Sequence, residues 1–394
     1  MSTVRSVLTS MRPGSGCPRM RAARPANMKR VTCLLLLILT AAMSACAGSS
    51  HVSTLSSTAS PSARPSTTAD GVQPTPRGWT TQNSTTSTSV PEGPLPGNLL
   101  IADRGNSRLL IVSPDKKILW SMSIPGAAAS SGHLLGPDDA FLTPDKKHIT
   151  INEEDNQLVA VIDIASKQIV WQYGHPGVRG SAQGYLSTPD DAYMLPDGTI
   201  TVADIGNDRI LFIDTKGQVI KQYGTTGLRD HNPPKALAAP NGDTPLPDGG
   251  MMTTEIGRSY ADRLDKSGNL VYSLHLMNVS YPSDAQLLAN GNILVSDYNA
   301  PGRLEILTPQ GKVVWDYHVT SGPGKLDHPS LALQLPNGNI VANDDRNHRV
   351  VVIDPRTKHI VWQYGATGLA GVRPGELNTP DGIDFIPAGS SPRY

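Results

Sequence analysis

A pattern of four short apolar segments, each closed by a turn motif, recurs along most of the chain. Its clearest copy runs from Thr188 to Gly224. The turns Pro-Asp-Gly, Gly-Asn-Asp and Thr-Lys-Gly separate its four apolar segments, which are Ala192–Leu195, Ile200–Ala203, Ile210–Ile213 and Val219–Tyr223. Segments this short, divided by such turns, are typical of strands in an antiparallel meander rather than of helices. One four-stranded sheet cannot bury both of its faces, so a repeated sheet predicts an all-β fold, the β-propeller.

The other copies support this interpretation. The turn between the first two strands recurs roughly every 40–50 residues, the period expected of propeller blades. Its copies begin at Leu142, Leu195, Leu246, Leu288 and Leu335. The last strand of four copies carries a tryptophan, at Trp120, Trp171, Trp315 and Trp362. Because large aromatic side chains dominate buried contacts, we expect these four to pack between neighbouring blades.

The two ends of the repeat region predict how the ring closes. The first copy begins at Gly97 and lacks its first strand, whereas the chain ends with an unpaired first strand, Thr379–Pro387. Paired beside Leu99–Ala102, this last strand would complete a blade. Closing the ring removes exposed sheet edges, which are otherwise templates for aggregation. We therefore predict a six-bladed propeller of four-stranded antiparallel blades over residues 97–394.

Residues 1–45 have the features of a secretory signal region. The signal begins with the basic residues of Met28-Lys-Arg. An apolar stretch and then small residues follow, up to Cys46. The apolar stretch Leu34–Ala42 is too short to span a bilayer, which takes about 20 apolar residues. Met28 is the favoured true start, and an extended signal beginning at Met1 is the alternative.

A lipid anchor is predicted at the end of that signal. The motif Met43-Ser-Ala-Cys46 resembles a bacterial lipobox, which implies cleavage before Cys46 and lipid on its sulfur. The other two cysteines, Cys17 and Cys33, would be removed, so no disulfide or cysteine-based metal site remains. Residues 46–96 are rich in Ser, Thr and Pro, a composition that predicts a disordered linker between the membrane and the propeller. The protein would then be extracytoplasmic and held at the bacterial cell membrane only by its lipid.

Two family resemblances bear on function. Turns such as Asp204-Ile-Gly-Asn-Asp-Arg209 resemble those of NHL-repeat propellers, a mixed family of extracellular sensors, scaffolds and a few lyases. More weakly, His328-Pro-Ser-Leu-Ala-Leu with Gly311-Lys-Val-Val-Trp before it is similar to a blade of the bacterial arylsulfotransferases. That second resemblance implies His328 as the nucleophile of sulfuryl transfer, with arginines binding the sulfate.

The repeat also predicts where a binding site lies. In a four-stranded blade, the start of the first strand and the turn between the second and third strands share one end, here called the top face. Strand starts from all six blades therefore meet around the axis, together with the connections that carry His133, His175, His231 and His328. The predicted ligand-binding residues there are Asp138, Asp139, Asp190, Asp191 and Asp284, and the same starts contain Asn241, Asp243, Ser283, Ser330 and Asp381.

The consecutive Asp pairs are the unusual feature of these strand starts. One Asp suffices to close a turn, and carboxylates gathered around one axis repel each other unless a cation, an arginine or a raised pKa relieves them. Oxygen-only ligands suit Ca²⁺. We therefore predict Asp139, Asp191 and Asp284 as candidate Ca²⁺ ligands.

Charge and motifs limit the function classes. Lys plus Arg and Asp plus Glu number 34 each, so nothing favours nucleic-acid binding, which needs a basic surface. Common nucleophile, nucleotide and zinc-protease motifs are also missing from the sequence. The prediction is a lipid-anchored propeller that binds an unidentified protein or small molecule through its top face and is not an enzyme. The alternative is an enzyme, either a sulfuryl transferase, which needs His328 pointing into the central cavity beside a His or Arg, or an NHL-type lyase.

Overall fold

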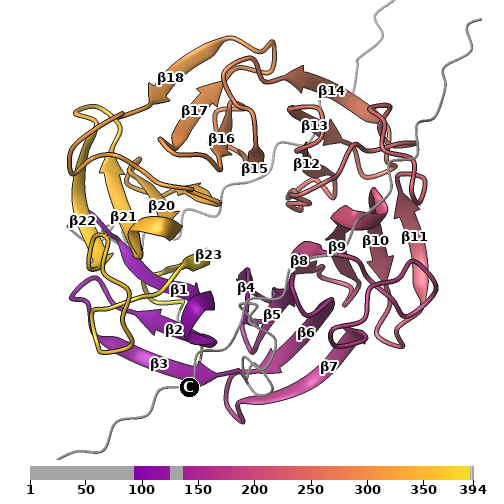
Figure 1. Ribbon diagram of the computed structural model, residues 1–394, viewed down its shortest axis with the longest axis horizontal. Helices are drawn as coiled ribbons and strands as arrows, with labels where there is room; N and C mark the ends of the chain where they lie inside the picture. The colour runs from indigo at the N-terminus through magenta and orange to yellow at the C-terminus, as the bar shows by residue number, and fades with distance from the viewer. Residues whose placement is uncertain (1–92, 125–135, 391, 393–394) are drawn as a thin grey trace, which may run out of the picture. The chain divides into compact units, whose positions relative to one another are not determined.

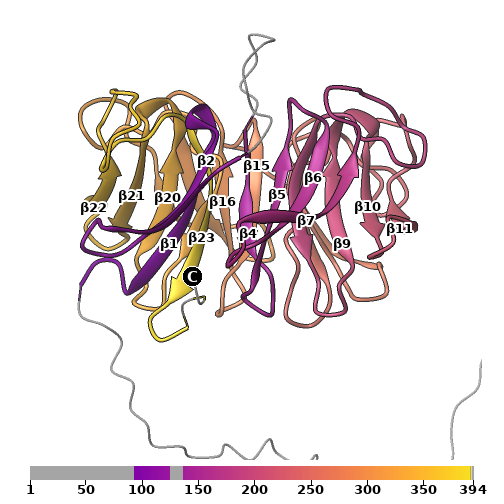
Figure 2. The ribbon, with the colours of Figure 1, turned by 90° about the horizontal axis from the view of Figure 1, so that it is seen from below.

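The computed structural model describes residues 93–124, 136–390 and 392. These residues form a closed ring of antiparallel sheets around a central axis (Figure 1). In the side view of Figure 2 the strands run between the two faces of the ring. The signal region, Cys46, residues 46–92 of the linker and His133 lie outside the described residues. No helix within the described part of the chain is long and apolar enough to cross a membrane.

Three blades come from the first half of the repeat region and from the C-terminal strand. Blade 1 consists of β23 (Pro380–Pro387), β1 (Gly97–Asp103), β2 (Arg108–Val112) and β3 (Ile118–Ser123). Blade 2 consists of β4 (Ala140–Leu142), β5 (His148–Glu153), β6 (Leu158–Asp163) and β7 (Gln168–Gly174). Blade 3 consists of β8 (Pro189–Met194), β9 (Ile200–Asp204), β10 (Arg209–Ile213) and β11 (Val219–Tyr223).

The other three blades follow in chain order. Blade 4 consists of β12 (Met251–Glu255), β13 (Tyr260–Leu264) and β14 (Leu270–His275). Blade 5 consists of β15 (Pro282–Leu287), β16 (Ile293–Asp297), β17 (Arg303–Leu307) and β18 (Val313–Tyr317). Blade 6 consists of β19 (Ala332–Gln334), β20 (Ile340–Asp344), β21 (Arg349–Asp354) and β22 (His359–Gly365). The predicted six-bladed ring is confirmed.

The predicted closure is also confirmed. Strand β23 pairs antiparallel with β1, with Ile383 opposite Ile101 and Phe385 opposite Leu99. Ile101, Leu99 and Ile383 are fully buried in one apolar cluster, which joins the two ends of the chain through the same core. The ring therefore has no open edge between its first and last residues.

Tryptophan side chains connect neighbouring blades, as expected. The Trp120 indole N–H donates to the Ile164 carbonyl in the next blade, at 3.1 Å. Trp315 and Trp362 make the same kind of bond to the blade that follows each of them, at 2.8 Å. Buried indoles need a hydrogen-bond acceptor, and here the adjacent blade supplies it.

Blade 4 differs from the prediction because its first strand is replaced by an irregular segment. Residues 240–245 lie beside β12 through isolated pairings of Pro240 with Glu255 and of Pro245 with Met251. Proline has no backbone N–H to donate, so Pro245 cannot donate to a regular ladder. Pro240 is not the cause, because β8, β15 and β23 begin with a proline at the same position. The segment keeps its place through a few bonds, such as the 2.9 Å bond from the Met252 N–H to the Thr244 carbonyl.

Three of the turns between second and third strands contain a short 3-10 helix, η1 (Arg104–Asn106), η2 (Ile205–Asn207) and η3 (Asp345–Asn347). In the second of these, Asp204 Oδ2 accepts hydrogen bonds from Asn207 and Arg209, both at 2.7 Å. Asp and Asn close turns by such side-chain bonds. This part of the repeated motif therefore has a structural role.

Candidate functional site

Each blade places one residue of its innermost segment against the axis. In every case this residue follows a proline, and the six positions are Asp138, Asp190, Asn241, Ser283, Ser330 and Asp381. Together with Arg104, Glu154, Tyr281 and Tyr298, they line a cavity of about 50 Å³, here called the axial cavity. The prediction that the strand starts meet at the axis agrees with this arrangement.

The residue before the proline explains the turn into the axial segment. Thr188, Ala239, His328 and Thr379 all have left-handed backbone conformations, with φ between 49° and 60°. Such a conformation is uncommon outside glycine, and the residue before a proline is further restricted. His328 therefore occupies a position that the fold uses for chain reversal in at least four blades.

The next residue along each axial segment forms a second set. Asp139, Asp191 and Asp284 are 3–5% exposed at this position. Another blade has Gly382 there, where an added Cβ would lie 2.5 Å from the Asp139 Cα. Only glycine fits such an approach, so blade 1 makes room for the buried carboxylate of blade 2.

Arg104 is the cation at the centre of this site. One of its terminal nitrogens donates to Asp138 and to Asp381, the latter at 2.7 Å, and the other donates to Glu154 and Asp155 at 2.9 and 3.1 Å. Burial acts to raise the pKa of Asp381, but the guanidinium outweighs it and holds that pKa below its ordinary value. One guanidinium thus serves four carboxylates.

The remaining axial carboxyls have raised pKa values. Burial raises the pKa of Asp139 well above its ordinary value, and the nearby Asp191 charge adds to the effect. Burial and the charge of Asp284 do the same to the pKa of Asp191. The pKa of Asp284 itself is raised to about 6 by burial, although hydrogen bonds from Gln286 and Thr244 oppose the rise. Without a cation, burial and like charges therefore disfavour the ionised forms of these carboxyls.

Several buried oxygens at the axis have no hydrogen-bond partner among the described residues. They are Asp191 Oδ2, Asn241 Oδ1, Asp345 Oδ2 and both carboxylate oxygens of Asp243. Asp243 is fully buried, and burial raises its pKa well above the ordinary value. The nearby Thr201 hydroxyl lowers this pKa, but only in part offsets the effect of burial. Buried oxygens are normally satisfied, so these atoms lack a partner that the described residues do not supply.

The predicted site residues divide into two groups in the structure. Carboxylate oxygens of Asp138, Asp139 and Asp190 come within 4.8 Å of one another, a grouping that can hold a metal ion. Asp284 instead contacts Thr244 and Gln286, at 3.1 and 2.9 Å. That an ion binds through Asp139, Asp191 and Asp284 stays a prediction.

His328 and His175 each contact a side chain of their own connection. His328 Nδ1 lies 2.7 Å from Asp327 Oδ1, and its ring is perpendicular to that of Tyr298. Tyr298, not His328, lines the axial cavity. His175 lies against Tyr185, with ring centroids 4.1 Å apart. In the described part of the chain, the contacts of His328 therefore lack the second His or Arg that sulfuryl transfer needs.

Sequence reasoning missed four residues that line the axial cavity, one of which, Tyr281, directly precedes the first strand of blade 5. The other three, Arg104, Glu154 and Tyr298, each directly follow the last residue of a second strand. The same position is apolar in blade 3, where it is Ile205. The residue type at this position varies between blades, from charged to aromatic to apolar. This variation within an otherwise regular turn was the sequence signal for these residues.

Known structures share the fold of this chain. A protein of unknown function from Bacteroides caccae is 18% identical, with a TM-score of 0.53 over 73% of this chain and 97% of that one. A chain of the nidogen/laminin complex is 16% identical, with a TM-score of 0.50 over the same shares. Virginiamycin B lyase from Staphylococcus aureus is 17% identical over 58% of this chain and 70% of that one, with a TM-score of 0.42.

Sequence comparisons add no family to this result. No protein-family profile and no curated protein matches the chain. At identities below 20% the structural likeness shows the propeller fold alone.

Proposed function

We propose that this protein is an extracytoplasmic, lipid-anchored binding propeller whose axial cavity takes up a divalent cation, with Ca²⁺ as the best-suited ion, or a cationic group of a larger ligand. The observation that carries the proposal is the set of buried, unpartnered oxygens on Asp191, Asp243 and Asn241. Carboxylate and amide oxygens are the ligands that Ca²⁺ takes in proteins. A propeller scaffold with a concave polar mouth is compatible with a binding role.

The charge balance of the axis supports the same conclusion. Arg104 bonds to Asp138, Asp381, Glu154 and Asp155, so its single positive charge is already shared among four carboxylates. Further buried carboxylates, Asp139 and Asp191 among them, have raised pKa values instead of positive partners. A cation entering from the top face would supply the positive charge that these carboxyls lack.

A Ca²⁺ titration of chelator-treated protein tests the proposal. Ca²⁺ at 100 times its Kd should stabilise the folded state by about 2.7 kcal/mol, measured as a rise in melting temperature. The double variant Asp139→Asn with Asp191→Asn should lose this response. Without Ca²⁺ it should melt at least as high as the wild type, because it has lost like-charge repulsion.

A matched control separates binding from surface charge. Asp115 is exposed at the turn between β2 and β3, so Asp115→Asn should respond to Ca²⁺ as the wild type does. An identical Ca²⁺ response in the wild type and the double variant would contradict the proposal. A double variant that melts markedly lower with and without Ca²⁺ would show that these carboxylates close turns instead.

A further inference from the structure

Blade 4 lacks an ion pair that other blades have in the turn between their second and third strands. In blades 1, 3 and 6 an Asp ending the second strand pairs with an Arg beginning the third, at 2.6–2.7 Å. In blade 4 the equivalent acid is Glu255, and the residue opposite it is Tyr260. Arg258 of the same turn has 57% of its side chain exposed and lies 3.8 Å from Asp230. The buried Glu255 carboxylate therefore needs a different partner.

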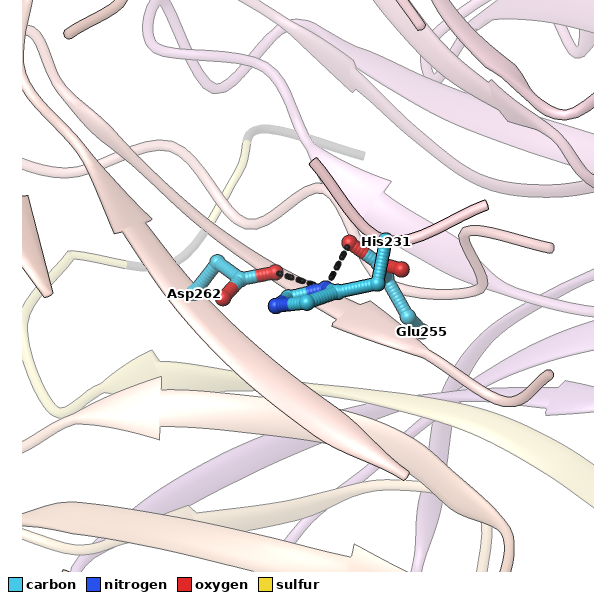
Figure 3. A group of neighbouring side chains, drawn as sticks. All are labelled: His231, Glu255 and Asp262. Carbon is cyan, nitrogen blue, oxygen red and sulfur yellow. Dashed lines mark hydrogen bonds and ion pairs between the residues drawn. The ribbon is translucent and has the colours of Figure 1, made fainter. Parts of the chain in front are cut away.

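His231 is that partner. It comes from the connection between β11 and β12, and its ring stacks on Tyr260 with centroids 3.6 Å apart and an interplanar angle of 13°. Its Nδ1 lies 3.1 Å from Glu255 Oε1 (Figure 3). The tyrosine that replaces the arginine thus provides the surface on which the imidazole is held.

Asp262 brings a second carboxylate to the same imidazole. Its side chain is fully buried, its Oδ2 lies 4.0 Å from His231 Nδ1, and neither oxygen has a hydrogen-bond partner within the described residues. The equivalent residue of blade 5 is Glu305, which accepts bonds from Arg303 and Asn278 at 3.0 and 2.9 Å. A buried carboxylate with no donor is costly, so Asp262 is short of a positive partner.

We propose that His231, Glu255 and Asp262 bind a divalent transition-metal ion, with Zn²⁺ as the representative. Their ligand atoms all lie within 4.8 Å of one another, on a loop and two adjacent strands. Zn²⁺ binds imidazole nitrogen and carboxylate oxygen at about 2.0–2.2 Å, so one ion fits among donors spaced in this way. A nitrogen ligand distinguishes this set from the oxygen-only axial site.

Neighbouring groups already orient two of the ligands. The Ser273 Oγ lies 3.1 Å from His231 Nε2 and can accept a hydrogen bond from its N–H, which leaves Nδ1 free to bind the ion. The Ala238 N–H donates to Glu255 Oε2 at 2.7 Å, which leaves Oε1 turned toward the imidazole. Protein metal sites commonly fix their ligands by such outer contacts.

The ion would be reachable from solvent. His231 is 20% exposed, whereas the Glu255 and Asp262 side chains are fully buried. Three protein ligands leave a fourth position for water or for an external ligand.

Zn²⁺ competition on chelator-treated full-length protein tests the site, with Co²⁺ absorption in the visible range as a second readout. The wild type should bind one Zn²⁺ that His231→Gln and Asp262→Asn each weaken at least tenfold. Ser273→Ala should weaken binding by about 10–100-fold while leaving all three ligands in place. Ser273→Ala therefore tests the site even if His231→Gln fails to fold.

Two controls locate the ion. His275 contacts the same tyrosine ring, at 4.9 Å, but is not among the ligands, so His275→Gln should bind Zn²⁺ as the wild type does. The axial variant Asp139→Asn with Asp191→Asn should also keep its Zn²⁺ affinity, which distinguishes this site from the proposed function. Equal Zn²⁺ affinity in the wild type, His231→Gln and Asp262→Asn would overturn the proposal.

Discussion

Replacing Arg104 with methionine tests how the axial carboxylates are held in one place. The guanidinium side chain is 11% exposed and bonds to Asp138, Asp381, Glu154 and Asp155. Methionine keeps much of the length of the side chain but removes its charge and all of these donors. The buried carboxylates would then face each other with no cation between them.

The expected cost follows from that geometry. Removing one partner of a buried ion pair typically costs about 3–5 kcal/mol, because an uncompensated charge is left behind. For a propeller of this size, that loss corresponds to a fall in melting temperature of roughly 5–8 °C. Arg104→Lys should recover only part of the loss, since an ammonium cannot reproduce the two-pronged guanidinium contact.

The effect should depend on pH. Arg104 holds the pKa of Asp381 below its ordinary value, so in the wild type this carboxylate stabilises the fold above pH 3.8 and loses that effect only in stronger acid. In the variant the guanidinium no longer opposes burial, so we expect the pKa of Asp381 to rise, as that of Asp138 already does. The folded state of the Arg104→Met variant then gains stability as the pH falls. The difference between wild type and variant should shrink from pH 7.5 to pH 5, toward about 1 kcal/mol for the lost hydrogen bonds.

Thermal or urea unfolding at the two pH values measures this difference. Arg356 is a suitable control, because its side chain is 88% exposed and pairs only with Asp354 among the described residues. Arg356→Met should change the melting temperature little at either pH. If the difference in unfolding free energy between the wild type and Arg104→Met is the same at pH 5 and pH 7.5, the argument that charge compensation holds the cluster is refuted.

Three further predictions concern closure, anchoring and pH. Deleting residues 378–394 removes β23 and should give an open ring that unfolds or aggregates, whereas unchanged melting would contradict the closure. Cys46→Ser should release the protein from the membrane fraction, and unchanged retention on fractionation would disprove the lipid anchor. Burial raises the pKa of Asp384 to about 6, against a hydrogen bond from the Leu142 N–H. The folded state thus keeps a proton that the unfolded chain loses above pH 3.8, so stability should fall as pH rises from about 4 to 6. Asp384→Asn should therefore stabilise the protein at pH 7.5 by up to about 3 kcal/mol, but not at pH 4.

The repeat made the architecture predictable because each turn motif determines its own local hairpin. Asp204 Oδ2 closes its turn through Asn207 and Arg209, which lie only three and five residues further along the chain. The missing strand of blade 4 was visible only as Pro245, because every blade has a proline at the position of Pro240. Whether a proline such as Pro245 ends a ladder depends on which edge of the strand faces the next one, which the pattern does not specify.

The axial residues were predictable for the same reason, and their partners were not. The position after the proline recurs in every blade, so the repeat itself brings Asp138 and Asp190 to the axis. Arg104 reaches Asp381 across 277 residues of chain, and that contact exists only once β23 has closed the ring. A sequence pattern cannot show which residues come together where β23 pairs with β1.

Both proposed sites include residues of blade 4 at places where it departs from the repeat. Its irregular first segment carries Asn241 and Asp243, which have buried oxygens without a hydrogen-bond partner among the described residues. Its turn replaces the usual arginine with Tyr260, which lets His231 stack above Glu255. Strand β12 runs beside both features, because Thr254 bonds to Gly242 at one position and Glu255 follows it at the next. Under both proposals, the cation would bind buried oxygens that the repeat leaves without a hydrogen-bond partner among the described residues.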